Sequence, residues 1–259
     1  MTRAPIVIDQ RVRAAADAHP YPLVFATVSG AHLYGFPSPD SDWDLRGAHV
    51  LSAASMLALD LHDETVSVES NRDGFELDLV THDLRKFIVM MLKRNGYVLE
   101  QLYSPLVVRT SAVHEELKHL GVRCITRHHA HHYFGFFRTQ WDLFAKEDPR
   151  RVKPLLYAYR VLLTGIHLMR TGRIEANLAV LNDDIHLPFI NDLIARKVGA
   201  KEKATIDDAD LAFHERECVQ LRQSLEAAAA ASTLPDAPTS RAALSALLVR
   251  TRLAELMSK

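Results

Sequence analysis

The stretch from residue 24 to residue 50, VFATVSGAHLYGFPSPDSDWDLRGAHV, constrains this chain more than any other. It begins with an apolar run typical of a buried strand, and that run ends at Ser29-Gly30. A short helix-like segment and a turn-rich loop follow, and the next strand begins with Asp42 and Asp44. Because side chains two residues apart in a strand point to the same face, we expect these two carboxylates to lie side by side.

Two neighbouring carboxylates repel each other unless a shared proton or a cation lies between them. Carboxylate oxygens are suitable ligands for a divalent cation such as Mg²⁺. The backbone amides of a glycine turn can hold phosphate groups, and here the turn precedes the carboxylate pair. The combination indicates metal-assisted phosphoryl chemistry on a nucleotide. A polar hairpin beside an ordinary turn is the alternative interpretation.

The order of these features resembles the DNA polymerase β nucleotidyltransferase superfamily, and within it the YcgL-type, RNA-repair-associated polymerase β-like family. The matching positions are Gly30, Tyr34, Gly35, Pro39, Ser41, Asp42, Asp44, Arg46 and Gly47. The family's turn is usually Gly-Ser, whereas Ala31 follows Gly30 here, so the hydroxyl expected on the triphosphate is missing. The turn amides remain, and Ser29 offers a hydroxyl from the other side of the glycine.

The resemblance implies a third carboxylate on a strand beside the first pair. Residues 75–80, FELDLV, alternate so that Glu76 and Asp78 share one face and the apolar side chains share the other. We choose Asp78 because it lies just ahead of a predicted helix at residues 84–93, as in the family. Glu76 is the fallback. The alternative is that both carboxylates simply face water at an exposed sheet edge.

The composition is that of a globular protein with a substantial core, since 48% of the 259 residues are apolar and the formal net charge is −1. This balance gives no overall attraction to nucleic acid or to anionic membranes. No apolar stretch approaches the roughly 18–20 residues of a membrane span, and residues 1–10 lack a signal-peptide pattern. Cys124 and Cys218 have no metal-type spacing and are interpreted as reduced thiols, so we expect a cytoplasmic protein.

From about residue 111 onward the periodicity is helical. We predict an α+β fold: a polymerase β-type nucleotidyltransferase domain with a small mixed sheet at residues 1–110, followed by an all-helical domain at residues 111–259. Lys153, Tyr157 and Arg160 are spaced to share one helix face, which the resemblance assigns to the triphosphate. The alternative is an ordinary basic stripe in contact with solvent.

Four histidines between residues 128 and 132 include the i, i+3 and i+4 spacing that can bind a metal on a helix. No nearby cysteine, aspartate or glutamate completes such a site. A packed helix with polar edges is therefore the preferred interpretation.

The resemblance implies transfer of a nucleoside monophosphate from an NTP, such as ATP, to a hydroxyl, with release of pyrophosphate. Asp42, Asp44 and Asp78 would hold two Mg²⁺ ions, for which Mn²⁺ can substitute. Further nucleotide contacts would come from Ser29, Gly30, Ser41, Arg46, Lys153 and Arg160.

The expected partners are the NTP and an RNA acceptor or an RNA-repair protein, and no membrane partner is expected. Two alternatives stay open. One is transfer to protein hydroxyls, as in nucleotidyltransferases of the toxin–antitoxin type, and the other is a non-catalytic relative that binds nucleotide or RNA. The sequence selects neither the NTP nor the acceptor, and it does not give the oligomeric state.

Overall fold

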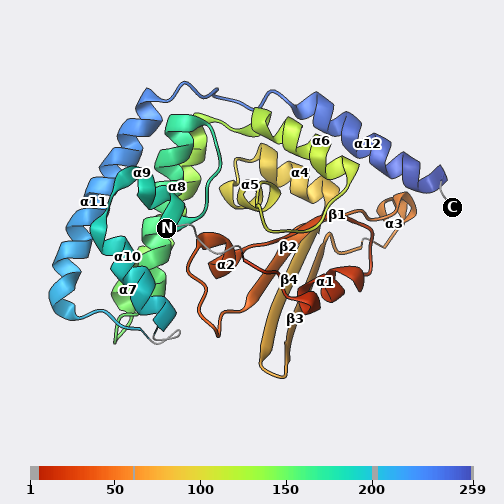
Figure 1. The fold of residues 1–259 in the computed structure, drawn as a ribbon. Coiled ribbons are helices and arrows are strands. Elements are labelled where there is room, and N and C mark those ends of the chain that lie inside the picture. Colours follow the sequence, from red (N-terminus) through yellow and green to blue (C-terminus); the bar gives the residue numbers. More distant parts are fainter. Residues whose placement is uncertain (1–5, 61, 200–203, 258–259) are drawn as a thin grey trace. The chain divides into compact units, whose positions relative to one another are not determined.

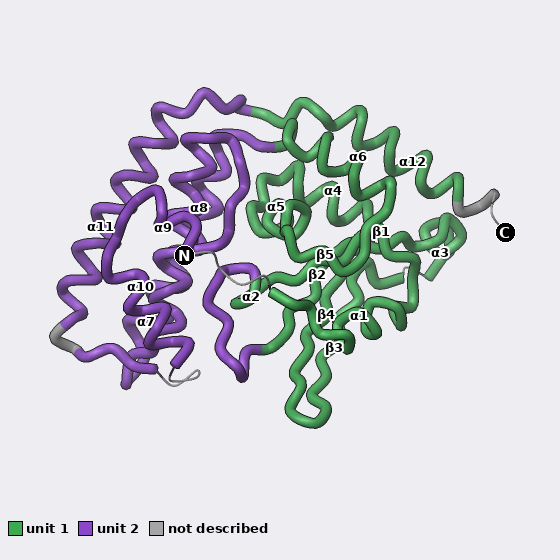
Figure 2. Tube along the Cα trace, in the orientation of Figure 1, with its two compact units in different colours: residues 1–32, 42–124, 237–259 green, residues 33–41, 125–236 purple. Residues whose placement is uncertain are grey.

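The computed structural model describes residues 6–60, 62–199 and 204–257. The first five residues, which contributed to the signal-peptide expectation, lie outside this range. Figure 2 shows the two compact units into which the chain divides. Unit 1 consists of residues 1–32, 42–124 and 237–259, and unit 2 of residues 33–41 and 125–236.

Unit 1 contains a five-stranded sheet, and the small mixed sheet predicted from the sequence is confirmed. Its strands are β1 (Leu23–Val28), β2 (Trp43–His49), β3 (Thr65–Arg72), β4 (Phe75–Asp83) and β5 (Val107–Arg109). They lie in the order β3-β4-β2-β1-β5. The central strands β2 and β4 are parallel, and the other neighbours are antiparallel. The parallel pair therefore lies inside the sheet, where each of its strands is hydrogen-bonded to a neighbour on both sides. These neighbours fix the register of the pair.

Helices cover both faces of this sheet (Figure 1). On one face, Val12 and Ala16 of α1 (Gln10–Asp17) pack in a cluster with Leu45, Leu77 and Leu79. The other face carries α4 (Leu84–Leu92), α5 (Gly96–Leu102) and α6 (Ala112–Gly121), with the single-turn η1 (Val122–Cys124) after α6. Successive side chains of each strand therefore point to opposite faces of the sheet, and helices cover each face.

The β3–β4 hairpin follows the predicted pattern. Its turn residues Asp73 and Gly74 both have positive φ, 52° and 74°, as in the tight turns that match the strand twist. Along β4, the buried residues Leu77, Leu79 and Thr81 alternate with more exposed ones. The predicted alternation of this strand is confirmed.

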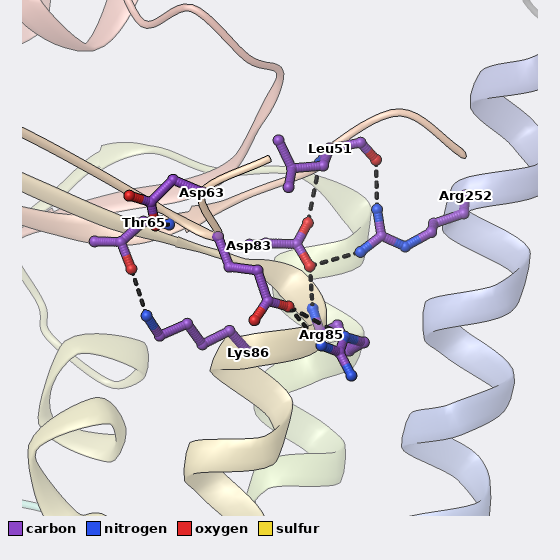
Figure 3. Close-up of polar contacts among 8 residues, drawn as sticks. Leu51, Asp63, Thr65, Asp83, Arg85, Lys86 and Arg252 are labelled. Atoms are coloured by element: carbon purple, nitrogen blue, oxygen red, sulfur yellow. Dashed lines mark hydrogen bonds and ion pairs between the residues drawn. The ribbon is translucent and has the colours of Figure 1, made fainter. Parts of the chain in front are cut away.

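The helix α12 (Arg241–Met257) completes unit 1 by packing against α4, α6 and the short α3 (Ala53–Leu57). Figure 3 shows its polar anchor, the fully buried carboxylate of Asp83. That carboxylate accepts hydrogen bonds from the backbone N–H groups of Leu51 at 3.0 Å and Arg85 at 2.9 Å. It also accepts one from Nη2 of Arg252 at 2.5 Å. One side chain thus joins the end of β4, the start of α4 and α12.

Unit 2 is helical. It comprises η2 (Arg127–His129), α7 (Ala130–Lys146), α8 (Val152–Thr171), α9 (Leu178–Ile185), α10 (Pro188–Gly199) and α11 (Asp208–Ala231). The central helix α8 is buried along most of its length and contacts the other four long helices of the unit. It ends at Gly172, whose φ of 68° forms a left-handed C-cap. Within the described ranges, none of the helices is both long enough and apolar enough to cross a membrane.

The division into units differs from the predicted boundary at residues 110 and 111. Helices α6 and α12 belong to unit 1, and residues 33–41 belong to unit 2. The reason is long-range packing: Leu244 and Leu247 of α12 are buried, and Arg252 reaches Asp83 across 169 positions. No local sequence pattern indicates that α12 packs against helices of unit 1.

A pair of neighbouring histidines, His49 and the half-buried His19, makes unit 1 sensitive to acid. His49 is fully buried, and its Nδ1 shares the Thr81 hydroxyl with Nε2 of His19, each at 2.8 Å. Burial, and then the neighbouring His19, lowers the pKa of His49 to about 4, although Asp83 opposes the shift. The neutral ring is therefore favoured in the folded state.

We expect the free energy of unfolding to fall by about 2 kcal/mol between pH 7.5 and pH 5 on account of His49. The folded-state pKa lies below the ordinary value of 6.5, so the unfolded chain takes up the proton first. The stabilisation is complete above pH 6.5 and is lost as the pH falls toward 4. Urea unfolding at the two pH values measures this, and the His49→Gln variant should show a smaller difference. Equal pH dependence in both proteins would contradict the assignment.

Candidate active site

The parallel pairing of β2 with β4 places two of the predicted carboxylates next to each other. Asp44 lies opposite Asp78 in the ladder, and both carboxylates contact Arg46, two residues after Asp44. Leu77 and Leu79 point to the other face, into the core beneath α1. Because a slip by one residue would expose those leucines, the apolar face of β4 fixes the direction of the Asp78 side chain.

The guanidinium of Arg46 lies between the two carboxylates. Its Nη2 donates to Oδ1 of Asp44 and to Oδ2 of Asp78, each at 2.6 Å, so these oxygens lie within about 5 Å of each other. Its Nη1 donates to the backbone carbonyl of Asp78 at 2.5 Å. The repulsion expected between the carboxylates is therefore balanced by a cation from the same strand.

Tyr97 of α5 holds Arg46 from its other end. Nε of Arg46 donates to the Tyr97 hydroxyl at 3.0 Å, and Asn95 caps α5 by accepting from the Tyr97 backbone N–H at 3.0 Å. Burial opposes the charge on Arg46, but Tyr97 and the two carboxylates outweigh it and raise the pKa of the guanidinium. Arg46 is therefore a permanent cation here. No sequence pattern indicates this role for Tyr97, because an aromatic residue at a helix start is usually part of the core.

Gly30 brings the glycine turn against the carboxylate of Asp44. It opens α2 (Gly30–Tyr34) with a φ of +60°, and a Cβ atom at this position would lie 1.7 Å from Oδ2 of Asp44. The Ser29 backbone N–H donates to the Asp44 carbonyl at 2.8 Å. The side chains of Ser29 and Ala31 are buried, and the Ser29 hydroxyl has no hydrogen-bond partner within the described ranges. Only glycine allows this approach of turn to carboxylate.

Replacing Gly30 by alanine should lower the free energy of unfolding by roughly 1–3 kcal/mol, because the residue combines a left-handed backbone with a collision against Asp44. Urea denaturation measures the loss. Gly74→Ala is a matched control, since Gly74 also has a positive φ, of 74°, but no atom lies within 4 Å of a Cβ there. The amount by which the loss of unfolding free energy in Gly30→Ala exceeds that in Gly74→Ala measures the cost of the collision with Asp44. Equal losses would mean that the turn moves away from Asp44 without cost.

Asp42 lines an open hollow of about 500 Å³ at the start of β2. The hollow is also lined by Glu69, Ser70, Asn71, Glu76, Leu77 and Asp78. Glu76 accepts a hydrogen bond from Nδ2 of Asn71 at 2.7 Å, whereas Asp78 contacts Arg46. Asp42 thus shares the hollow with Asp78, and Asp78 shares Arg46 with Asp44. The structure brings Asp78 rather than Glu76 to the cation that also holds Asp44.

In the part of the chain that the structure describes, no three Asp, Glu, His or Cys side chains stand close enough to form a complete metal site. At the carboxylates, the guanidinium of Arg46 occupies the shared position. In the histidine run, His128 contacts Asp236, with Nε2 to Oδ1 at 3.2 Å, and stacks on His131 with ring centres 5.9 Å apart. This run is the packed start of a helix, the interpretation preferred from the sequence.

In unit 2, Lys197 of α10 fixes the loop of residues 33–41. Its buried ammonium group donates to Oγ of Ser38 at 2.7 Å and to Oγ of Ser41 at 2.9 Å. The two serines also form a turn, in which the Ser41 N–H donates to the Ser38 carbonyl at 2.9 Å. Ser41 directly precedes Asp42, so Lys197 orders the segment that leads into the carboxylate strand. No local pattern connects Lys197 with this loop, and sequence reasoning missed it.

The predicted basic face of α8 contacts the same loop. The guanidinium carbon of Arg160 lies 3.7 Å from the ring centre of Tyr34, and the Tyr157 ring meets Tyr34 edge-on at 5.4 Å. Arg160 is fully buried, and Lys153 on the preceding turns is half-buried. The alternative of a solvent-exposed stripe is therefore wrong for Arg160.

Two curated proteins are similar to this chain. The uncharacterized protein MJ0002 of Methanocaldococcus jannaschii is 32% identical over 156 residues, which cover 60% of this chain and 64% of that protein. The uncharacterized protein YcgL of Bacillus subtilis is 26% identical over 176 residues, covering 65% of this chain and 64% of that protein. The matched part of this chain thus spans slightly less than two thirds of the length of each relative.

A solved structure, the nucleotidyltransferase-like protein from Exiguobacterium sibiricum, matches with 12% identity and a TM-score of 0.33, over 85% of this chain and 73% of that one. The family model described as RlaP, RNA repair pathway DNA polymerase beta family, matches residues 5–250. This match covers nearly the whole chain and confirms the family resemblance predicted from the strand, turn and carboxylate pattern. The protein belongs to the RNA repair pathway DNA polymerase beta family.

Proposed function

We propose that this protein transfers a nucleoside monophosphate from an NTP to a hydroxyl group, with release of pyrophosphate, and that the acceptor is the 3′ end of an RNA. The observation that carries the proposal is the meeting of Asp44 and Asp78 at one cation, beside a glycine turn that touches Asp44. Membership in an RNA repair family of the polymerase β type supports both the reaction and the acceptor.

The donor groups suit two Mg²⁺ ions, which Mn²⁺ can replace. Asp42, Asp44 and Asp78 offer carboxylate oxygens only, which are the ligands that Mg²⁺ prefers, and two of them already converge on a cation. Bound metal supplies charge neutralisation at the phosphates and a lower pKa for the attacking hydroxyl. In this proposal Arg46 exchanges its carboxylate contacts for the phosphates of the NTP, to which a guanidinium can donate two parallel hydrogen bonds.

The chain's own groups then position the reactants. The Ser29 N–H is already bonded to the Asp44 carbonyl, so Gly30 and the turn amides that follow it hold the β and γ phosphates. Asp78 accepts the proton of the acceptor hydroxyl. The hydroxyl oxygen forms a bond to the α-phosphorus as the bond from that phosphorus to the bridging oxygen breaks. Pyrophosphate leaves with the electron pair of the broken bond. Positioning and charge neutralisation provide most of the rate enhancement.

Ser41 and Lys153 complete the proposed nucleotide contacts, and Arg160 supports them indirectly. Ser41 is held by Lys197 immediately before Asp42, and Lys153 of α8 is a half-buried residue. Arg160 lies fully inside unit 2 against Tyr34, so its proposed effect on the nucleotide is exerted through the loop that it packs against.

The test is incubation of the protein with each α-labelled NTP, Mg²⁺ or Mn²⁺, and an RNA oligonucleotide with a free 3′ hydroxyl. We expect the label to join the RNA, and a 3′-deoxy end to prevent it. Label that appears on protein in a cell extract, but never on RNA, would replace the proposal with protein-hydroxyl transfer. NTP binding without transfer to any acceptor would replace it with the non-catalytic alternative.

A further inference from the structure

Unit 2 contains a second hollow, of about 520 Å³, between α7 and α11. Its volume falls in the range of about 300–1,000 Å³ that is usual for small-molecule sites. Aromatic side chains of α7 line it, together with charged side chains from both helices. None of these residues belongs to the carboxylate site, so the proposed reaction leaves this hollow without a role.

The aromatic lining is a rigid platform centred on Trp141. This half-buried ring stacks on Phe137, with centres 6.1 Å apart and planes 24° apart, and lies 5.4 Å from Phe144. Phe137 and Phe144 are buried, so they fix the indole from behind. Phe134, two turns earlier on the same helix, is half-buried and also lines the hollow. The platform therefore offers flat apolar surface without a need for rearrangement.

Gly135 keeps this hollow open. It lies in the middle of the long helix α7, where glycine is less favourable than alanine by about 1 kcal/mol. No atom lies within 4 Å of the position a Cβ would take, so packing within unit 2 does not require a glycine there. Gly135 lines the hollow, and any side chain at this position would occupy part of its volume.

The charged groups of the hollow come in two matched sets. On α7, Arg138 precedes Asp142 by one turn, and on α11, Arg222 precedes Glu226 by one turn, with Nη2 to Oε1 at 4.0 Å. All four side chains are exposed. The hollow thus offers a guanidinium and a carboxylate from each side and carries no net charge from these groups.

We propose that this hollow binds one nucleotide of a single-stranded nucleic acid, with the base stacked on Trp141. A base such as adenine matches both the flat platform and the carboxylates of Asp142 and Glu226, which accept hydrogen bonds from its exocyclic amino group. A strand carries one charge per phosphate on each side of a base, which suits two guanidiniums on different helices. A free triphosphate concentrates its charges at one end and suits this arrangement less well.

The experiment is fluorescence anisotropy of a labelled adenine 12-mer with the full chain, in EDTA and without NTP. Gly135→Leu should weaken binding by about tenfold or more, because loss of base stacking typically costs that much. Leucine is a better helix former than glycine, so the variant should unfold at the same or a higher temperature than the wild type. Arg138→Gln should lower the slope of log affinity against log salt by about 0.7, the value for one phosphate contact on a single strand.

Leu143→Ala provides the matched control on the same helix, since Leu143 is exposed and does not line the hollow; its affinity should equal that of the wild type. Equal affinity of wild type and Gly135→Leu for the 12-mer would overturn the proposal. AMP binding as tight as that of the 12-mer would also overturn it, in favour of a mononucleotide pocket. Because the assay contains no metal or NTP, failure of the transfer reaction would leave its result unaffected.

Discussion

The Asp44→Asn variant is expected to lose nucleotidyl transfer by roughly 10²–10³-fold. Asparagine keeps the size of the side chain and an oxygen that can accept from Arg46, but it lacks the negative charge that the proposed metal site requires. The measurement is the single-turnover rate of label transfer to RNA at saturating NTP. Thermal unfolding of the same samples separates a loss of chemistry from a loss of fold.

Glu76→Gln is the matched control, because Glu76 lines the same hollow as Asp78 but does not contact Arg46 in the structure. Its rate should stay within a few-fold of the wild type, and Asp78→Asn should behave like Asp44→Asn. If Glu76→Gln lost most of its transfer rate and Asp78→Asn stayed active, Glu76 rather than Asp78 would be the third carboxylate of the site. Full activity of Asp44→Asn would refute the site as a whole.

Replacing Asp83 by alanine should lower the free energy of unfolding by about 3–5 kcal/mol, the usual cost of removing one partner of a buried ion pair. The change leaves the nearly buried Arg252 guanidinium without its carboxylate, and it removes the acceptor that caps α4. Urea denaturation followed by far-UV circular dichroism measures the loss.

The same helix supplies the control for this prediction. Arg250 pairs with Glu116 at 2.6 Å, almost the separation of Arg252 from Asp83, but both side chains are largely exposed. Arg250→Ala should therefore cost less than about 1 kcal/mol. If Arg250→Ala and Asp83→Ala had the same effect, burial would not be what gives the Asp83 contact its strength.

The strands could be predicted where the pattern is local. The alternation of β4 and the Asp73-Gly74 turn are contained in a dozen residues, and both follow directly from side-chain periodicity and backbone preference. In contrast, β5 has only three residues, Val107–Arg109, and forms by pairing with the distant β1. A segment this short carries no periodicity, so the edge of the sheet could not be found from the sequence.

In the candidate site, too, only the features with a local sequence signal could be predicted. Strand alternation and the family pattern both act over short distances, and they select the carboxylates at positions 42, 44 and 78 as candidates. That Arg46 lies between two of them depends on the parallel register of β2 with β4, which no local signal specifies. The contacts of Tyr97 and Lys197 depend on helices that follow much later in the chain. The sequence therefore identifies candidate acids better than the groups that hold them.

The order in which the units are completed has a consequence for synthesis on the ribosome. The chain passes between the units at four places, after residues 32, 41, 124 and 236. The sheet of unit 1 is therefore translated first, but α12 follows only after all of unit 2 has been made. A nascent chain must hold unit 1 without α12, with the Asp83 carboxylate not yet matched by Arg252, during translation of more than a hundred residues. A premature stop near residue 240 would spare every candidate catalytic residue and still leave a polypeptide that cellular proteases should remove.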